Sequence, residues 1–172
     1  CTFTDTSGAM ADTSVTYGTV SDDSHTAAVT VHDSDANGAI GFSCTYTDLA
    51  GNAIASAITA ASSGDIDIDN THPTWSSVAF AAGDYVNAAE DNGNVNLVIT
   101  TVGVDNNQVV TATLNSAAYT CTITSNACTA VITGAGLRAL TDGTAYTFSV
   151  AVSDAAGNAA TADTSESFTY DI

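Results

Sequence analysis

Acidic side chains spaced two positions apart are the groups in this sequence best suited to hold a metal ion. The run Asp33-Ser-Asp-Ala-Asn-Gly38 places Asp33, Asp35 and Asn37 at alternate positions before a glycine. Alternating oxygen ligands before a glycine turn are typical of calcium loops. Position twelve of such a loop is Cys44 rather than a bidentate acid, which excludes an EF-hand. Since Asp, Asn and Gly are also ordinary turn residues, a calcium loop and a plain turn both remain open.

A second group of acids lies around the only proline. Asp65-Ile-Asp-Ile-Asp69 carries three alternating carboxylates on one face of an expected strand, shortly before Pro73. Calcium accepts six to eight oxygens in irregular geometry, so acids from several loops could share one ion. A solvated acidic face without metal is the alternative. The predicted ligands of this joint site are Asp48, Asp67, Asp69, Asp91 and Asp105.

The cysteines predict disulfides. They are even in number and lack the paired short spacings of a zinc site, which favours an oxidising, extracytoplasmic environment. Three pairings are possible, of which we favour Cys1–Cys44 and Cys121–Cys128, the second across a hairpin. A lipid on an N-terminal cysteine is the alternative for Cys1.

Composition excludes several classes of partner. The chain has 19 acidic residues against one basic residue, Arg138, and a formal charge of −18. Binding to nucleic acid or to an anionic membrane needs Lys and Arg in number. No run of 18 apolar residues occurs, so no membrane-spanning helix is expected. No nucleophile motif stands out, and carboxylate pairs among so many acids discriminate nothing, so we predict no enzymatic activity.

The elements that must position these residues are strands. Period-2 patterns of β-branched and aromatic residues recur along the chain, separated by Asn-Gly and Asp-Gly turns, and they predict antiparallel β-sandwiches. One short helix is expected at 135–140. The predicted strands are 28–32, 40–46, 75–80, 95–99, 109–114, 145–152 and 166–171.

An internal repeat divides the chain. Tyr46-Thr-Asp-Leu-Ala-Gly-Asn52 recurs as Val152-Ser-Asp-Ala-Ala-Gly-Asn158, 106 positions later. Such recurrence indicates tandem modules. Pro73, which forces an extended conformation on the residue before it, marks a short linker. We therefore predict two domains, 1–70 and 71–172.

Taken together, these motifs resemble a known family. The Asp-x-Ala-Gly-Asn run, a following strand and then Ile68-Asp-Asn-Thr-His-Pro-Thr74 are similar to the bacterial Ig-like repeats of giant calcium-dependent surface adhesins. The resemblance implies two tandem Ig-like sandwiches, an extracellular cell-surface location, calcium at the joints, and adjacent modules or copies of the chain as partners.

The first module departs from this pattern. Trp75 precedes Asp154 by 79 positions, whereas only 47 residues precede the equivalent Asp48. The first sandwich is therefore predicted to lack its opening strands. Either the chain is cut from a longer array, or its open edge takes a strand from another subunit. We predict a structural module of an adhesin or an extracellular filament. A carbohydrate-binding accessory module of a secreted hydrolase, with Trp75 as sugar platform, is the alternative.

Overall fold

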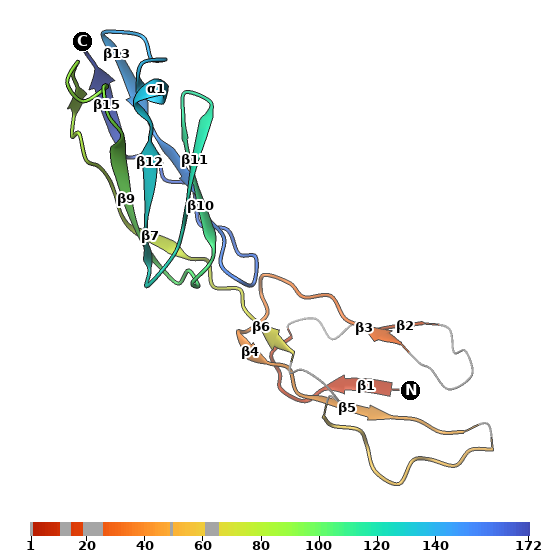
Figure 1. Cartoon of the computed structure of the whole chain (residues 1–172). Coiled ribbons are helices and arrows are strands. Elements are labelled where there is room, and N and C mark those ends of the chain that lie inside the picture. The colour runs from red at the N-terminus through yellow and green to blue at the C-terminus, as the bar shows by residue number, and fades with distance from the viewer. Residues whose placement is uncertain (1, 11–14, 19–25, 49, 61–65) are drawn as a thin grey trace. The chain divides into compact units, whose positions relative to one another are not determined.

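The computed structural model of the chain describes residues 2–10, 15–18, 26–48, 50–60 and 66–172. Within these ranges the chain is almost entirely β, with mostly antiparallel pairing and one short helix. It divides into two compact units, Cys1–Asn70 (unit 1) and Thr71–Ile172 (unit 2), and Figure 1 labels most of their strands. The prediction of an all-β antiparallel chain is confirmed.

Unit 2 contains three hydrogen-bonded sheets. Their strand orders are β12-β9-β7, β11-β10-β14 and β13-β15-β8. Only Phe148 separates β13 from β14, so the last two sheets are joined through one run, 144–151. The strands are β7 Thr74–Phe80, β8 Tyr85–Val86, β9 Val95–Val102, β10 Val109–Leu114, β11 Ala117–Thr122, β12 Ala127–Ile132, β13 Thr144–Thr147, β14 Ser149–Ala151 and β15 Ser167–Tyr170.

The order of pairing in unit 2 is Ig-like. β9 pairs with β12 and β10 pairs with β14, so strands distant in sequence become neighbours in both layers. Crossovers of this kind are the Greek-key connections of an Ig sandwich. Among the described strands, β8 and β15 are the one pair that runs parallel.

The core of unit 2 comes from strict alternation along the strands. In β9 the inward positions Val95, Leu97 and Ile99 are buried, while the residues between them are more exposed. Period-2 alternation places one face of each strand inside. Aromatic side chains close the core, with the Phe80 ring centroid 5.1 Å from that of Phe148 and 4.8 Å from that of Phe168.

The expected short helix is present as α1, Gly134–Leu137. The Thr133 hydroxyl accepts a hydrogen bond from the Gly136 amide, which caps the helix N-terminus. A β-carbon on Gly134 would lie 2.6 Å from the Asp91 carbonyl oxygen, so only glycine fits there.

The Cys121–Cys128 disulfide is confirmed, and a tight hairpin turn lies between its cysteines. The two α-carbons are 5.7 Å apart. Thr124 pairs with Ala127 through two backbone hydrogen bonds, and Ser125 and Asn126 between them have positive φ. β11 pairs with β10, and β12 pairs with β9 in the other sheet, so the bridge also links the two sheets.

Unit 1 is built from short two-stranded sheets. β1 pairs with β5, β2 with β3 and β4 with β6, all antiparallel. Among its described residues the only buried apolar side chains are Met10 and Ile68. The strands are β1 Thr2–Asp5, β2 Thr16–Tyr17, β3 Ala27–Ala28, β4 Gly38–Ala39, β5 Phe42–Thr45 and β6 Asp67–Ile68.

Two predicted strands of unit 1 are shorter than expected. Of the strand expected at 28–32, only Ala28 lies in a strand, as part of Ala27–Ala28. The strand expected at 40–46 is reduced to Phe42–Thr45. Cross-strand neighbours stabilise a strand, and the described part of unit 1 offers few of them. Cys44 is disulfide-bonded, while its predicted partner Cys1 lies outside the described residues, so that pairing stays a prediction.

Candidate functional site: the repeated loops and their carboxylates

The carboxylate of Asp154 is enclosed by its own loop. Its Oδ1 accepts hydrogen bonds from the backbone amides of Gly157 and Asn158, each at 2.8 Å, and its Oδ2 accepts one from the Asn158 side chain at 2.9 Å. Gly157 has a φ of 101°, a conformation that glycine adopts without strain. Asp154, Gly157 and Asn158 therefore close this turn together.

The loop at Asp48 repeats this arrangement. Asp48 Oδ1 accepts from the amides of Ala50 at 2.9 Å and Asn52 at 2.8 Å, and Oδ2 accepts from the Asn52 side chain at 2.8 Å. Gly51 has a φ of 90°. The repeat seen in the sequence is thus a repeated turn in the structure.

These hydrogen bonds favour the ionised carboxylates. The Asn52 side-chain amide, with the backbone amides of the loop, lowers the pKa of Asp48 below its usual value. Burial raises the pKa of Asp154, but hydrogen bonds from Asn158 and neighbouring amides outweigh it, so that pKa is also lowered. Hydrogen bonds to the charged form stabilise that form.

The turn accounts for the Asp-x-x-Gly-Asn spacing without a ligand. A carboxylate has about four acceptor positions, and three on Asp48 are directed at its own loop. The expectation of a metal ligand at Asp48 rested on its carboxylate and on a loop position from which acids could share one ion. The regular spacing of aspartate, glycine and asparagine was the signal for a self-closing turn.

The loop with Asp35 and Asn37 is tied to the end of β6. The Asp35 carboxylate is 5% exposed and its Oδ2 accepts from the His32 amide at 2.8 Å. Asn37 donates to Asp69 Oδ1 at 3.3 Å and accepts from the Asn70 amide at 2.8 Å. Asn70 also donates to the carbonyl oxygen of Asp35 at 2.9 Å. The predicted ligands Asn37 and Asp69 are therefore brought together, and Asp35 belongs to the same loop.

Asp48 lies in a different loop from this group. Ala39 in β4 pairs with Asp67, and the chain then runs through β5 before it reaches Asp48. A site that joins Asp48 to Asp67 and Asp69 stays a prediction. Asp33 is exposed on the turn beside Asp35.

The two predicted ligands in unit 2 lie at opposite ends of β9. Asp91 precedes the strand, is 6% exposed, and its Oδ2 accepts from the Tyr170 hydroxyl at 2.9 Å, while its carbonyl oxygen accepts from Arg138. Asp105 follows the strand, and its Oδ2 accepts from the Ala155 amide at 3.1 Å, beside the Asp154 turn. Burial and Asp91 together raise the pKa of Tyr170. Asp91 is thus part of a buried network, and Asp105 is the more accessible acid.

Within the described ranges, no three His, Cys, Asp or Glu residues are grouped so that they could hold a metal ion. No described helix is long and apolar enough to cross a membrane. The calcium ligands Asp33, Asp35, Asn37, Asp48, Asp67, Asp69, Asp91 and Asp105 remain predictions.

Side chains near the first residue of unit 2 fix this segment to a later loop of the same unit. The Trp75 indole Nε1 donates to the Thr161 carbonyl oxygen at 2.7 Å, and His72 Nδ1 lies 2.8 Å from the Ala159 carbonyl oxygen. Trp75 packs against the core. It is therefore a structural residue here, not an exposed platform for a sugar.

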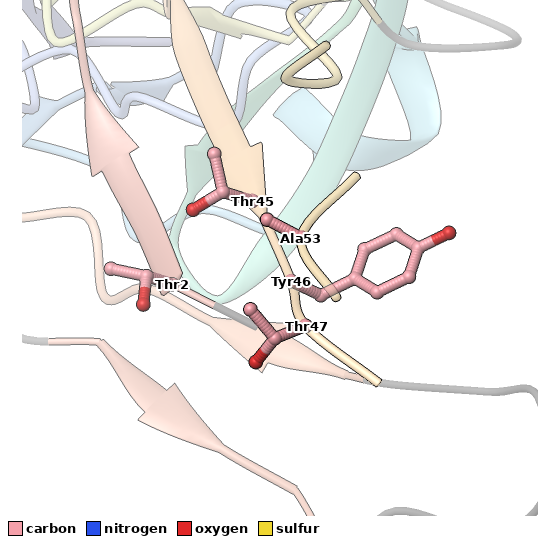
Figure 2. A pocket seen from close by; sticks show the side chains of 5 residues that line it. All are labelled: Thr2, Thr45, Tyr46, Thr47 and Ala53. Atoms are coloured by element: carbon pink, nitrogen blue, oxygen red, sulfur yellow. The ribbon is translucent and has the colours of Figure 1, made fainter. Parts of the chain in front are cut away.

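A shallow depression of about 190 Å³ lies beside the Asp48 loop in unit 1. Figure 2 shows its threonine and alanine walls and the Tyr46 ring, which extends away from the threonines. The lining offers hydroxyl groups and no charge. Its residues are Thr2, Thr45, Tyr46, Thr47 and Ala53.

The chain is similar to several solved bacterial structures. A bacterial immunoglobulin-like domain from the M. primoryensis ice-binding adhesin is 28% identical, with a TM-score of 0.41 over 58% of this chain and 96% of that one. A tetra-tandem repeat in the extending region of a large adhesion protein is 26% identical, with a TM-score of 0.46 over 98% of this chain and 40% of that one. A Ca²⁺-stabilised adhesin with which an Antarctic bacterium reaches out and binds ice is 27% identical, with a TM-score of 0.42 over 77% and 32%.

The chain thus spans less than half the length of the last two structures. No protein-family model and no curated protein matches it. All three TM-scores are below 0.5. The chain is similar to bacterial Ig-like domains and adhesin repeats, the group that its motifs resemble.

Proposed function

We propose that the chain is a structural, non-enzymatic tandem of Ig-like modules in a prokaryotic cell-surface adhesin or extracellular filament. The repeated turn is the observation that carries this proposal. Asp48 and Asp154 close their loops with matching hydrogen bonds, 106 positions apart in the sequence. Repeats that conserve a turn, rather than a pocket, suit a spacer that presents other domains at a distance.

The two units act as successive modules, so the partners of each are adjacent modules of the same kind or copies of the chain. The segment that joins them is short, with only 69–73 between β6 and β7. Pro73 removes one rotational freedom from it, and His72 and Trp75 bind to loops of unit 2. A short, restrained linker transmits orientation and force better than a flexible one.

Calcium completes the stiffening in this proposal. Asp67 and Asp69 lie close to the last residue of unit 1, next to the linker. In unit 2, Asp105 follows β9 three positions after Val102, which pairs with Thr74 at the start of β7. A net charge of −18 opposes compaction unless cations screen or bind the acids. A shared calcium ion would neutralise these carboxylates and remove hinge freedom.

The carbohydrate-binding alternative receives no support from a described residue. It needed Trp75 as an exposed platform, whereas the indole is bonded to Thr161 and packed on the core. The extracellular location follows from the disulfide between Cys121 and Cys128 together with the modular role, since disulfides persist in oxidising surroundings.

Small-angle X-ray scattering of the full chain in millimolar calcium and in EDTA tests the stiffening. The expected result is a longer, narrower distance distribution in calcium, lost in the double variant Asp67→Asn/Asp69→Asn. Asp84→Asn, which removes an exposed acid beside β8 in unit 2, is the matched control and should keep the response. Identical profiles in calcium and EDTA would remove calcium from the proposal.

A further inference from the structure

We propose that two copies of the chain pair side by side through β11 of unit 2, so that one sheet continues across both copies. The inference rests on the modular function proposed above and specifies the surface through which copies meet. That surface is the free edge, defined as the backbone amides and carbonyl oxygens of Ala118, Thr120 and Thr122.

β11 is the last strand of its sheet. The strand order is β11-β10-β14, and within the described ranges no strand pairs with β11 on its other side. β10 and β11 form a hairpin in which Leu114 lies opposite Ala117 across two turn residues, Asn115 and Ser116 (Figure 1).

Alternate residues of β11 direct their backbone groups away from β10. In a two-residue hairpin the residues flanking the turn form a hydrogen-bonded pair, and such pairs alternate along the ladder. Tyr119 and Cys121 therefore bond to β10. The Ile123 amide continues this series and donates to the Gln108 carbonyl oxygen at 2.8 Å. The residues of the free edge lie between these positions and are all exposed.

The edge of β7, in the other sheet, is closed by its own chain. Glu166 Oε1 accepts a hydrogen bond from the Phe80 amide at 2.6 Å, and the Phe80 carbonyl oxygen accepts one from the Gly83 amide at 3.0 Å. The register of β7 also shifts between Trp75 and Ser77. An acidic side chain and an irregular register are features that prevent edge-to-edge pairing.

The remaining edges of unit 2 are shorter. β8 has two residues and β13 has four, against six in β11. The Asn126 carbonyl oxygen accepts from the Thr101 amide at 2.8 Å, so every second residue of β12 bonds to β9. Thr129 and Val131 then point outward, because the Ala127 amide is bonded within the tight turn. β11 therefore has the longest unguarded edge among these strands.

The charge distribution admits a second copy at this edge. Each chain carries a formal charge of −18, yet the strands of unit 2 contain no charged residue. The acids of unit 2 all lie in its turns and loops. Two chains of the same sign therefore meet with the least repulsion when they approach along their strands.

The free edge is also complementary to itself. When two β11 strands run antiparallel with Thr120 opposite the same residue of the second copy, Ala118 lies opposite Thr122 on both sides of the axis. This register forms about six main-chain hydrogen bonds between the copies. It also places two threonine side chains opposite each other on the outer face, a favourable cross-strand pair. The pairing uses the edge of each copy, so it closes at a dimer.

The dimer is expected to be weak and to depend on salt. One strand pair buries less surface than the roughly 1,200 Å² of a standard interface. The two like charges repel each other at a distance, and salt screens this repulsion. In an array of such modules, repeated weak contacts would reinforce each other.

The first test follows the wild-type full chain in EDTA, which removes contacts that need calcium. Sedimentation equilibrium from about 10 μM to about 1 mM should show a reversible monomer–dimer equilibrium. The dissociation constant should be at least about tenfold lower in about 0.5 M than in about 0.05 M NaCl.

Residue-resolved amide hydrogen exchange then locates the contact without any substitution. The amides of the free edge should exchange at least about fivefold more slowly at the highest concentration than at the lowest. The Tyr119 amide, which bonds to β10, should exchange at the same rate at both concentrations. Unchanged exchange at Ala118, Thr120 and Thr122, or a monomer at every concentration and salt, overturns the proposal.

Two pairs of variants test the register. Thr120→Pro removes the central outward donor and should weaken dimerisation at least about tenfold, whereas Thr129→Pro, the same change on the edge of β12, should alter it less than about twofold. Thr120→Asp places two carboxylates opposite each other and should also abolish the dimer. Thr147→Asp, at an exposed position of β13, adds the same charge and should retain it. Equal effects within either pair contradict the assignment to β11.

Other occupants have distinct outcomes. A chain that stays monomeric while an added peptide of alternating Thr and Val protects the free-edge amides would make another polypeptide the partner, which overturns the choice of a second copy. Species larger than a dimer would contradict the closed pairing. A monomer in EDTA whose scattering profile still responds to calcium would refute this inference alone. A dimer without a calcium response would refute only the calcium stiffening.

Discussion

Unit 1 and unit 2 share a loop and a strand register but differ in how much they bury. In unit 2 two layers face each other, and Leu97, Phe148 and Phe168 are enclosed between them. Among the described residues of unit 1, the buried apolar side chains are Met10 and Ile68. The comparison separates two levels of the fold. The Asp-x-x-Gly-Asn turn forms from local hydrogen bonds alone, whereas a stable core needs the second layer.

The largest effect expected from this comparison is a truncation at paired core positions. Phe148→Ala should destabilise unit 2 by about 3–5 kcal/mol, because it leaves a cavity beneath Phe80 and Phe168. Phe42→Ala, at the equivalent position in unit 1, should cost about 1 kcal/mol or less.

The only tryptophan, Trp75, lies in unit 2 and reports its unfolding by fluorescence during denaturant titration, and far-UV circular dichroism of the full chain follows unit 1 as well. Equal losses in unit 2 and unit 1 from the paired truncations would show that unit 1 has a closed core after all.

The disulfide gives the next effect in size. Replacing Cys121 and Cys128 together by serine should destabilise unit 2 by about 2.5 kcal/mol, from the entropy of a short loop in the unfolded chain. The bridge joins two sheets of unit 2, whereas the described strands of unit 1 form only two-stranded sheets. Thermal unfolding followed by Trp75 fluorescence measures the loss. An unchanged midpoint would mean that core packing alone holds the crossover.

The paired turns give a smaller effect. Asp154→Ala leaves the amides of Gly157 and Asn158 without their acceptor in a buried setting and should cost about 2 kcal/mol. Asp48→Ala should have a smaller effect, because its loop is exposed to water. Chemical denaturation of both variants, with Asp84→Asn as a surface control, checks the order. A larger loss for Asp48→Ala would indicate a role beyond turn closure.

The smallest effect is the pH dependence of Asp154. Its pKa is lower in the folded chain than its usual value. The carboxylate therefore contributes stability above about pH 4, and this stability is lost as pH falls toward the folded pKa. Between about pH 5 and pH 3 the wild-type chain should lose more thermal stability than Asp154→Asn. The same drop in both would assign the acid sensitivity to other carboxylates.

The sequence was most informative where local rules decide the structure. The alternation in 95–99 and 109–114 predicted β9 and β10, and the seven-residue spacing predicted the pairing of Cys121 with Cys128. The tight turn at Thr124–Ala127 was also expected, but the sequence did not show that β11 and β12 on either side of it join different sheets. Which sheet a strand joins depends on distant partners.

The candidate site was harder to predict for the same reason. Carboxylates suit both calcium and a self-closing turn, and only the fold shows that Asp48 faces its own loop while Asn37 meets Asp69. The strand expected at 28–32 is nearly absent although its β-branched residues are suitable. A strand also needs cross-strand neighbours, and residue preferences alone do not reveal whether such a neighbour is present.

The most direct test of the account is residue-resolved amide hydrogen exchange of the full chain at equivalent hydrogen bonds. The Ile54 amide donates to Tyr46 at 3.1 Å, and the Ala160 amide donates to Val152 at 2.9 Å. We predict that Ile54 exchanges at least about a hundredfold faster than Ala160, roughly 2.8 kcal/mol less opening free energy, because only the second lies in a closed sandwich. Equal protection at the two amides would contradict the central claim that the described part of unit 1 is less enclosed than unit 2.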